Sequence, residues 1–370
     1  MKRSTYQKRI ARLRERIEGI APDAVWILEP ETRRYFSGFK AQDGQINESS
    51  GSLIISAEAA CLITDSRYAA EARREAPDFE VILFRQDFAE TLADLLDRIG
   101  VGNLGFQEDF LAWGLHARLR RRLRKVPRTV RITPLKGLPE RMREVKDEAE
   151  IRAMAAASDL MSRVLARVIE GLEPGVTEKQ VAWLIEGLAR EGGADSLAFP
   201  SIVASGPNAA LPHAVPTDRR IRAREPVILD VGLKWKGYCC DMTRTIFLGD
   251  PRPKFKKIYR TVREAQLRAL ETLRPGVKST VPDRAARDLI TAAGFGSYFG
   301  HALGHGVGLD THEGPRLGPA NPVRLERGMV VTVEPGIYIP GQGGVRLEHM
   351  VVLEDKGPRI LTRDDHFYDF

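Results

Sequence analysis

Four acidic residues lie at the ends of apolar segments in the C-terminal part of the chain, where their carboxylates would face a core. They are Asp230, Asp241, Glu334 and Glu348. A buried carboxylate without a partner costs several kcal/mol or stays protonated, and four that converge would also repel one another. Divalent cations relieve both penalties, so we expect a metal site. The alternative is four separate carboxylates, exposed or paired with an arginine such as Arg244 or Arg346.

A segment rich in histidine and glycine adds a second kind of ligand. Three of the chain's seven histidines lie within twelve residues: His301, His305 and His312. The glycines between them argue against a helix, so the HxxxH spacing does not indicate a helical zinc pair. Glycine permits a close backbone approach instead, and we expect these histidines to line a pocket.

Four carboxylates and one imidazole form an oxygen-rich ligand shell, which favours Mn²⁺ and similar ions over thiolate-bound zinc. These oxygens could bridge two metals about 3.5–4 Å apart. Such a pair lowers the pKa of a bridging water and polarises the carbonyl under attack, which is hydrolytic chemistry. Other machinery is not found in the sequence: the three cysteines form no CxxC motif, and there is no G-x-S-x-G, H-E-x-x-H or phosphate-loop motif.

The elements that must position these residues occur twice. A Leu-x-Pro-Gly-Val segment beginning at Leu172 recurs at Leu273, an offset of 101. The first acidic residues of the two halves are 104 residues apart and the second ones 107. We therefore expect residues 141–370 to form a duplicated α+β unit of two helices and a hairpin. The expected helices are 144–170, a second after the N-cap Thr177, 259–273, and one from near Pro282.

Residues 1–135 are predicted to be a separate α/β domain, because short apolar strands alternate with helical patterns. The expected strands are 24–28, 51–56 and 60–64, and the expected helix is 88–99. Prolines and a glycine between 127 and 140 indicate a linker. Arg33 and the aromatic segment 35–39 could form the edge of a pocket; a strand and turn in the core is an equal alternative.

The net charge of +7 is local rather than global. Residues 1–20 contribute +5 and residues 118–131 contribute +8, which leaves −6 for the remainder. No aromatic residues interleave with the arginines of 118–131, as a single-strand platform would require, so we expect a solvated helix face or a subunit contact and no nucleic acid. The N-terminus lacks the apolar stretch of a signal peptide, and no apolar run approaches about 20 residues. We therefore expect a cytoplasmic protein without a membrane segment.

Taken together, these motifs resemble a known family. They are Ser205–Asn208 through His213, Asp230–Gly232, Asp241–Thr245, Gly304–Gly308, His312–Pro315, Glu334–Gly336 and Arg346–Glu348. In this order they resemble the pita-bread metallopeptidases, which comprise methionine aminopeptidase, Xaa-Pro aminopeptidase and Xaa-Pro dipeptidase (prolidase). The N-terminal part is similar to the creatinase-type domain of the Xaa-Pro branch.

The resemblance implies a role for each candidate residue. The five metal ligands would be Asp230, Asp241, His305, Glu334 and Glu348. Asp241 and Glu348 would bridge two divalent ions, and His305 would bind one ion only. The other catalytic roles would be carbonyl stabilisation or positioning by His213 and His312, a proline subsite at His301, support of the ligands by Arg346, and proton transfer by Glu334. Mn²⁺ is expected, with Co²⁺, Zn²⁺ and Fe²⁺ as alternatives.

The resemblance implies an aminopeptidase that cleaves the N-terminal Xaa-Pro bond of peptides through a metal-bridging hydroxide, in a homodimer. An Xaa-Pro dipeptidase is the alternative. A remote alternative is a catalytically silent binding module that uses the basic stretch. Creatine hydrolysis is disfavoured by the intact ligands, and methionine aminopeptidase by the N-terminal domain. Two departures from the family pattern are Cys240, where Ser or Ala is expected, and His349, where Asp is frequent.

Overall fold

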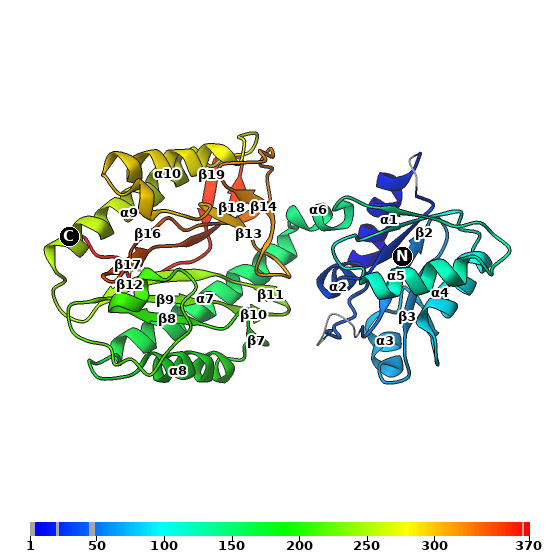
Figure 1. The fold of residues 1–370 in the computed structure, drawn as a ribbon, viewed down its shortest axis with the longest axis horizontal. Helices are drawn as coiled ribbons and strands as arrows, with labels where there is room; N and C mark the ends of the chain where they lie inside the picture. Colours follow the sequence, from blue (N-terminus) through cyan, green and yellow to red (C-terminus); the bar gives the residue numbers. More distant parts are fainter. Residues whose placement is uncertain (1–3, 20–21, 44–48, 365) are drawn as a thin grey trace. The chain divides into compact units, whose positions relative to one another are not determined.

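The chain divides into two compact units, Met1–Arg143 and Glu144–Phe370. The structure is a computed structural model that describes residues 4–19, 22–43, 49–364 and 366–370 (Figure 1). Residues 1–3 and 20 of the basic N-terminal stretch therefore lie outside the described residues. Each unit is described by itself below.

The N-terminal unit is an α/β domain built on one six-stranded sheet, in the order β4-β3-β2-β1-β5-β6. Its central strand β1 pairs antiparallel with β2 and parallel with β5, and all four β1 residues are buried. The strands are β1 (Ala24–Ile27), β2 (Ser52–Ser56), β3 (Ala60–Thr64), β4 (Glu80–Leu83), β5 (Asn103–Phe106) and β6 (Arg131–Pro134). The helices are α1 (Thr5–Ile17), α2 (Pro30–Ser37), α3 (Ala69–Glu75), α4 (Phe88–Arg98), α5 (Trp113–Leu123) and α6 (Leu138–Glu144).

Two expectations for this unit need correction. The segment 127–140 is not a plain linker, because it contains β6, an edge strand of the sheet, and the first turn of α6. The aromatic segment 35–39 is not a strand and turn. It is the end of helix α2, which stops at Gly38 with a left-handed φ of 83°. Tyr35, Phe36 and Phe39 are buried, as the core alternative expected.

The C-terminal unit carries four helices and thirteen strands among the described residues. The helices are α7 (Glu148–Glu170), α8 (Glu178–Glu191), α9 (Pro253–Thr272) and α10 (Thr280–Ala292). The strands of the first half are β7 (Ser196–Leu197), β8 (Ile202–Ser205), β9 (Pro226–Val231), β10 (Leu233–Trp235), β11 (Tyr238–Cys239) and β12 (Met242–Phe247). Those of the second half are β13 (Gly304–Gly306), β14 (Glu313–Leu317), β15 (Val330–Val333), β16 (Gly336–Ile339), β17 (Gly343–Arg346), β18 (His349–Glu354) and β19 (Gly357–Ile360).

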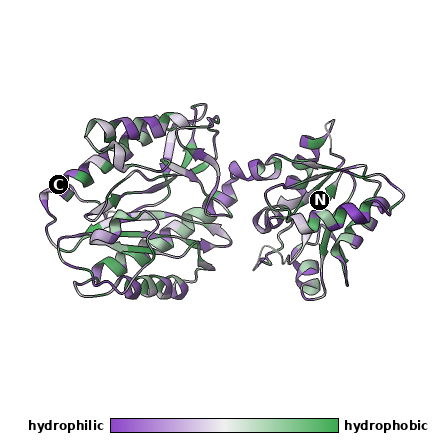
Figure 2. Ribbon diagram, viewed as in Figure 1, coloured by the Kyte–Doolittle hydropathy of each residue, from purple (hydrophilic) through white to green (hydrophobic). Residues whose placement is uncertain are grey.

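Amphipathic patterns and caps explain where these helices lie. Helix α7 begins at Glu148 rather than at 144, because Asp147 forms a capping box with Glu150. Thr177 caps α8 together with Gln180, as the sequence predicted. The helices turn their apolar faces to the strands, which lie between α8 on one side and α9 and α10 on the other (Figures 1 and 2).

The duplication extends to matching hydrogen bonds. Gly175 N donates to Ile221 O in the first half, and Gly276 N donates to Leu325 O in the second. In each half an arginine side chain also donates a hydrogen bond to the carbonyl oxygen of the same glycine: Arg220 to Gly175 O and Arg324 to Gly276 O. Two copies of one helix-helix-hairpin unit therefore face each other.

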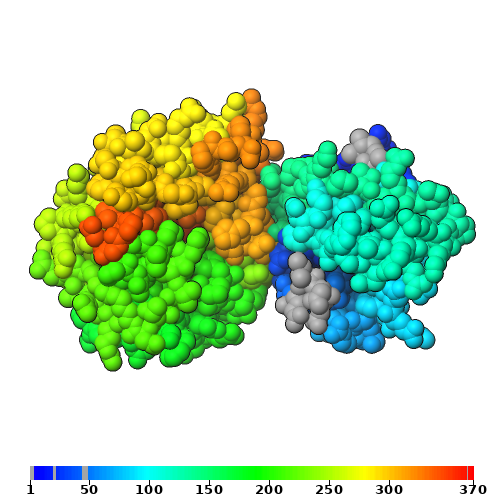
Figure 3. Space-filling view, in the orientation of Figure 1, coloured from blue at the N-terminus to red at the C-terminus, as the bar shows by residue number. Residues whose placement is uncertain are grey.

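The two halves each bury an apolar cluster against the strands. One cluster packs α7 and α8 against β9 and β12, and the other packs α9 and α10 against β15 to β18. In the space-filling view, residues of the two halves adjoin on the face shown (Figure 3). Among the described residues, no helix is long and apolar enough to cross a membrane.

Candidate metal centre

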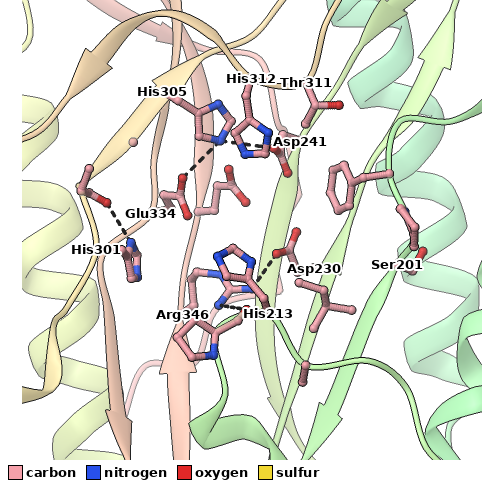
Figure 4. A pocket seen from close by; sticks show the side chains of 18 of the residues that line it. Ser201, His213, Asp230, Asp241, His301, His305, Thr311, His312, Glu334 and Arg346 are labelled. Carbon is pink, nitrogen blue, oxygen red and sulfur yellow. Dashed lines mark hydrogen bonds and ion pairs between the residues drawn. The ribbon is translucent and has the colours of Figure 1, made fainter. Parts of the chain in front are cut away.

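The strands bring the five expected metal ligands together from both halves (Figure 4). Asp230 lies in β9, opposite Thr243 of β12, and Asp241 directly precedes β12. Glu334 follows β15, and Glu348 lies in the two-residue connection between β17 and β18. His305 is the middle residue of β13, a strand and not a helix, as the glycines predicted.

The ligand atoms are close enough to share a cation. His305 Nε2 lies 3.3 Å from Glu334 Oε1 and 3.7 Å from Asp241 Oδ2. Donor atoms of Asp241, His305 and Glu348 all lie within 4.8 Å of one another. Carboxylate oxygens with one imidazole suit a hard or borderline divalent ion, so this donor set fits the metal that the sequence indicates.

Electrostatics also favour a cation here. Burial and the charge of Glu348 raise the pKa of Asp241 well above its usual range. Burial, with the charges of Glu334 and Asp230, raises the pKa of Glu348 to about 8. Because like charges in a buried site cannot all ionise without compensation, the carboxylates need added positive charge at neutral pH.

His305 and Glu334 form the one strongly stabilised ion pair among these groups. Burial alone would lower the pKa of His305, but the hydrogen bond and charge of Glu334 raise it to about 9. Burial alone would raise the pKa of Glu334, but the hydrogen bond and charge of His305 lower it to about 2. A metal ion would replace the proton that this pair shares.

Arg346 and Thr243 hold the carboxylates in place, and the sequence prediction missed Thr243. Arg346 Nη2 donates to Asp230 Oδ2 at 2.5 Å, and its Nε donates to Thr243 Oγ1 at 3.2 Å. Thr243 Oγ1 in turn donates to Glu348 Oε2 at 2.8 Å. One chain of hydrogen bonds therefore links expected ligands of the two halves, and such bonds orient the ligands of metal sites. The signal for Thr243 is its place two residues after Asp241.

The tautomer of His301 follows from its neighbours. Arg346 Nη1 donates to Tyr338 Oη at 2.8 Å, so the Tyr338 hydroxyl hydrogen is available to His301 Nε2, 2.9 Å away. His301 Nδ1 then donates to Ala302 O at 2.8 Å. Burial lowers the pKa of His301, so the ring is neutral. Both nitrogens are engaged, which leaves carbon edges for an apolar ligand. Tyr338, in β16, was not predicted.

The carboxylates open into a cavity of about 660 Å³. His213, His301, His312 and Arg346 line it, as does Arg316. The rings of His312 and His305 lie 4.2 Å apart between centroids. Burial and the neighbouring His305 lower the pKa of His312, so His312 is neutral and can donate one hydrogen bond into the cavity.

A buried carboxylate anchors the loop that carries His213. Glu178, at the start of α8, is fully buried and accepts hydrogen bonds from five donors. These are the backbone and hydroxyl groups of Ser205 and Thr217 and the amide of Asn208. His213 lies between these anchor points, so Glu178 fixes both ends of its loop.

The two departures from the family pattern, Cys240 and His349, leave the five expected ligands in the cavity. Cys240 is buried and its sulfur accepts a hydrogen bond from Leu233 N at 3.4 Å. His349 does not line the cavity. Its Nδ1 lies 2.9 Å from Thr362 Oγ1. Burial, with the charges of Arg244 and Arg263, lowers the pKa of His349 well below its usual range, so it stays neutral.

Family models match both units of the chain. Residues 152–355 match metallopeptidase family M24, and residues 9–145 match the creatinase/prolidase N-terminal domain. The chain belongs to metallopeptidase family M24 and is a hydrolytic enzyme. The expected fold, a creatinase-type N-terminal domain followed by a pita-bread catalytic domain, is thereby confirmed.

Similar proteins match over nearly their full lengths. The Xaa-Pro dipeptidase of Pyrococcus horikoshii is 35% identical over 351 residues, which cover 93% of each chain. The solved Xaa-Pro dipeptidase from Bacillus anthracis is 35% identical with a TM-score of 0.90, over 97% of this chain and 98% of that chain. The X-Pro aminopeptidase from Thermotoga maritima is 34% identical with a TM-score of 0.85, over the same shares. Both a dipeptidase and an aminopeptidase are thus similar to this chain.

Proposed function

We propose that this protein is an aminopeptidase that hydrolyses the N-terminal Xaa-Pro bond of peptides with two divalent metal ions. The observation that carries the proposal is the convergence of four carboxylates and one imidazole at the base of one cavity. Asp230, Asp241, His305, Glu334 and Glu348 would hold the ions. The ions would supply an acidified water as nucleophile and polarise the scissile carbonyl.

The remaining side chains of the cavity have separate tasks. Glu334 would accept a proton at one carboxylate oxygen and deliver it to the leaving nitrogen. His312 is neutral and would donate to the developing oxyanion, and His213 would share this role. His301 presents ring carbons and would contact the apolar proline ring.

Peptide hydrolysis with and without metal tests this proposal. Metal-stripped protein supplied with Mn²⁺ should release the first residue from Xaa-Pro-Yaa peptides. It should not cleave matched Xaa-Ala-Yaa peptides at a comparable rate. Chelation should abolish the activity, and added Mn²⁺ should restore it. Undiminished cleavage in the chelated sample would contradict the proposal.

A second candidate, the Xaa-Pro dipeptidase, is favoured by Arg316. This exposed guanidinium lines the cavity, and among the described residues it makes no hydrogen bond or ion pair. In an Xaa-Pro dipeptide the proline carries the free carboxylate, which an arginine binds well. A longer peptide has an uncharged amide at that place.

Comparing Xaa-Pro with Xaa-Pro-Yaa substrates separates the two candidates. A dipeptidase should prefer the dipeptide, and Arg316→Gln should raise KM for the dipeptide about tenfold while leaving the tripeptide unaffected. An aminopeptidase should cleave the tripeptide at least as well as the dipeptide, both in the wild-type protein and in Arg316→Gln. The preference for Mn²⁺ and the homodimer remain predictions, to be tested by metal analysis and by light scattering.

A further inference from the structure

A buried arginine lies directly behind the proposed ligands. Arg244 follows Thr243 on β12 and is fully buried. Its Nη1 donates to the backbone oxygen of Glu348 at 2.5 Å and to that of Thr243 at 2.8 Å. One guanidinium therefore joins β12 of the first half to the connection between β17 and β18 that carries Glu348.

The opposite edge of this guanidinium is held by a residue near the end of the chain. Arg244 Nε and Nη2 both donate to Asp364 Oδ1, at 2.9 and 2.7 Å. The two side chains are 0% and 4% exposed, so the ion pair is buried, and His366 Nδ1 lies 3.9 Å from Asp364 Oδ2. Asp364 Oδ2 is inaccessible and accepts no hydrogen bond among the described residues. Such exceptions among buried polar atoms call for a specific explanation.

The residues around Asp364 also form hydrogen bonds to β18, the strand that follows Glu348. Residues 361–364 and 366–370 are called the C-terminal segment here. Leu361 N donates to Met350 O at 2.9 Å, and Met350 N donates to Thr362 Oγ1 at 3.2 Å. The Phe367 ring covers the Arg244 guanidinium, with its centroid 4.4 Å from Cζ. The segment thus contacts both Arg244 and the start of β18, which directly follows Glu348.

We propose that the C-terminal segment is a positioning element of the metal centre, in which Asp364 acts through Arg244 on Glu348. This inference rests on the proposed function. Glu348 N donates to Thr243 O at 3.1 Å, and Arg244 Nη1 donates to the carbonyl oxygens of both residues. The guanidinium therefore reinforces the junction that places Glu348 beside β12 and Asp241. Asp364 fixes the plane and place of that guanidinium. A residue outside the cavity therefore tunes metal affinity.

Asp364→Asn tests this role with little change of shape. The amide keeps one oxygen acceptor but loses the charge that anchors Arg244. We expect Mn²⁺ affinity, measured calorimetrically on metal-stripped protein, to fall about tenfold or more, as for other residues that orient metal ligands. Asp364→Glu, which restores the charge, should recover part of this loss. At saturating Mn²⁺, kcat of Asp364→Asn should return to within about threefold of the wild-type value.

Tyr368→Phe is the matched control within the same segment. Tyr368 Oη accepts a hydrogen bond from Phe247 N at 3.1 Å, away from Arg244 and Glu348. Loss of this hydrogen bond in Tyr368→Phe should lower the melting temperature but leave Mn²⁺ affinity unchanged. Should Asp364→Asn fail to fold, Thr362→Val loosens the other attachment of the C-terminal segment, its hydrogen bond to Met350 N at the start of β18, and should weaken Mn²⁺ binding about threefold.

The possible outcomes separate this inference from the proposed function. If the wild-type protein binds no Mn²⁺, the proposed function fails. If the wild-type protein binds Mn²⁺ and the folded Asp364 or Thr362 variant binds it equally well, the positioning role fails while the function stands. Equal losses of affinity in Tyr368→Phe and Asp364→Asn would also overturn it, because they would indicate general destabilisation.

Discussion

The two halves of the catalytic unit share one architecture but contribute differently to the site. The first half, α7 to β12, and the second, α9 to β18, each supply two carboxylates from matching hairpins. The strand next to β9 is β8, which is apolar in its central residues, whereas the strand next to β15 is β13, which carries His305. Duplication therefore explains the carboxylates, and divergence explains the imidazole.

A second difference concerns the residue at the start of the second helix of each half. Glu178 N donates to Arg219 O, and Ser279 N donates to Val323 O, so the two residues are equivalent. Glu178 accepts five further donors and anchors the His213 loop, as described above. Ser279 Oγ accepts one hydrogen bond, from Val323 N. The first half thus uses a buried carboxylate to hold the loop of His213. The second half instead carries His305 directly on its glycine-rich strand β13.

Removing the equivalent carboxylates should show the symmetry of the halves most strongly. Asp241→Ala and Glu348→Ala should each lower kcat/KM for an Xaa-Pro substrate about 10³-fold or more, because each would remove a proposed metal ligand and several kcal/mol of metal catalysis. Asp355→Ala, at an exposed position, is the control and should be neutral. If kcat/KM fell in only one of these two variants, the two halves would not contribute equivalent carboxylates.

Substitutions at the two equivalent helix starts should show the asymmetry. Glu178→Gln should lower kcat about 10- to 100-fold, the effect of moving a catalytic group by about 1 Å. Ser279→Ala should change kcat less than about threefold, because no catalytic loop depends on it. Steady-state kinetics and melting temperatures would be measured on both. Equal effects would show that the His213 loop does not depend on Glu178.

The pH dependence of stability should differ between metal-stripped and Mn²⁺-loaded protein. The pKa of Glu348 is raised from 4.5 to about 8 in the folded state, so its ionisation destabilises the fold as pH rises through this range. The pKa of His305 is raised from 6.5 to about 9, and the stability that its charge provides is lost over that range. Both effects have the same sign.

Denaturant unfolding between pH 4.5 and 9 is the corresponding measurement. The free energy of unfolding of the stripped protein should fall relative to that of the Mn²⁺-loaded protein as pH increases. Glu348→Gln should remove much of this difference. A stripped protein that gains stability toward pH 9 would show that the carboxylates do not repel as described.

The sequence predicted those parts of the molecule that depend on local patterns. The helices α7 to α10, the capping of α8 by Thr177 and the duplication all follow from periodicity, caps and repeated turn residues. The five proposed ligands could be selected because their residue types and family motifs are distinctive. The prediction of a linker at 127–140 was wrong, because a proline in an edge strand such as β6 gives the same sequence signal as a proline in a linker.

The residues that position the ligands could not be found in this way. Thr243, Tyr338 and Glu178 act through hydrogen bonds to residues far away in the sequence, and their types are common in any protein. Asp364 contacts Arg244 across 120 positions. No local pattern encodes such pairs, since they depend on how the two halves and the chain end pack together.

Crystallography of the protein with Mn²⁺, with anomalous diffraction to locate the ions, tests the central claim most directly. The account predicts two ions about 3.5–4 Å apart. Asp241 and Glu348 should lie between them, Asp230 should bind one ion, and His305 and Glu334 the other. Finding no ion among these five side chains, while the protein still cleaves Xaa-Pro peptides, would contradict it.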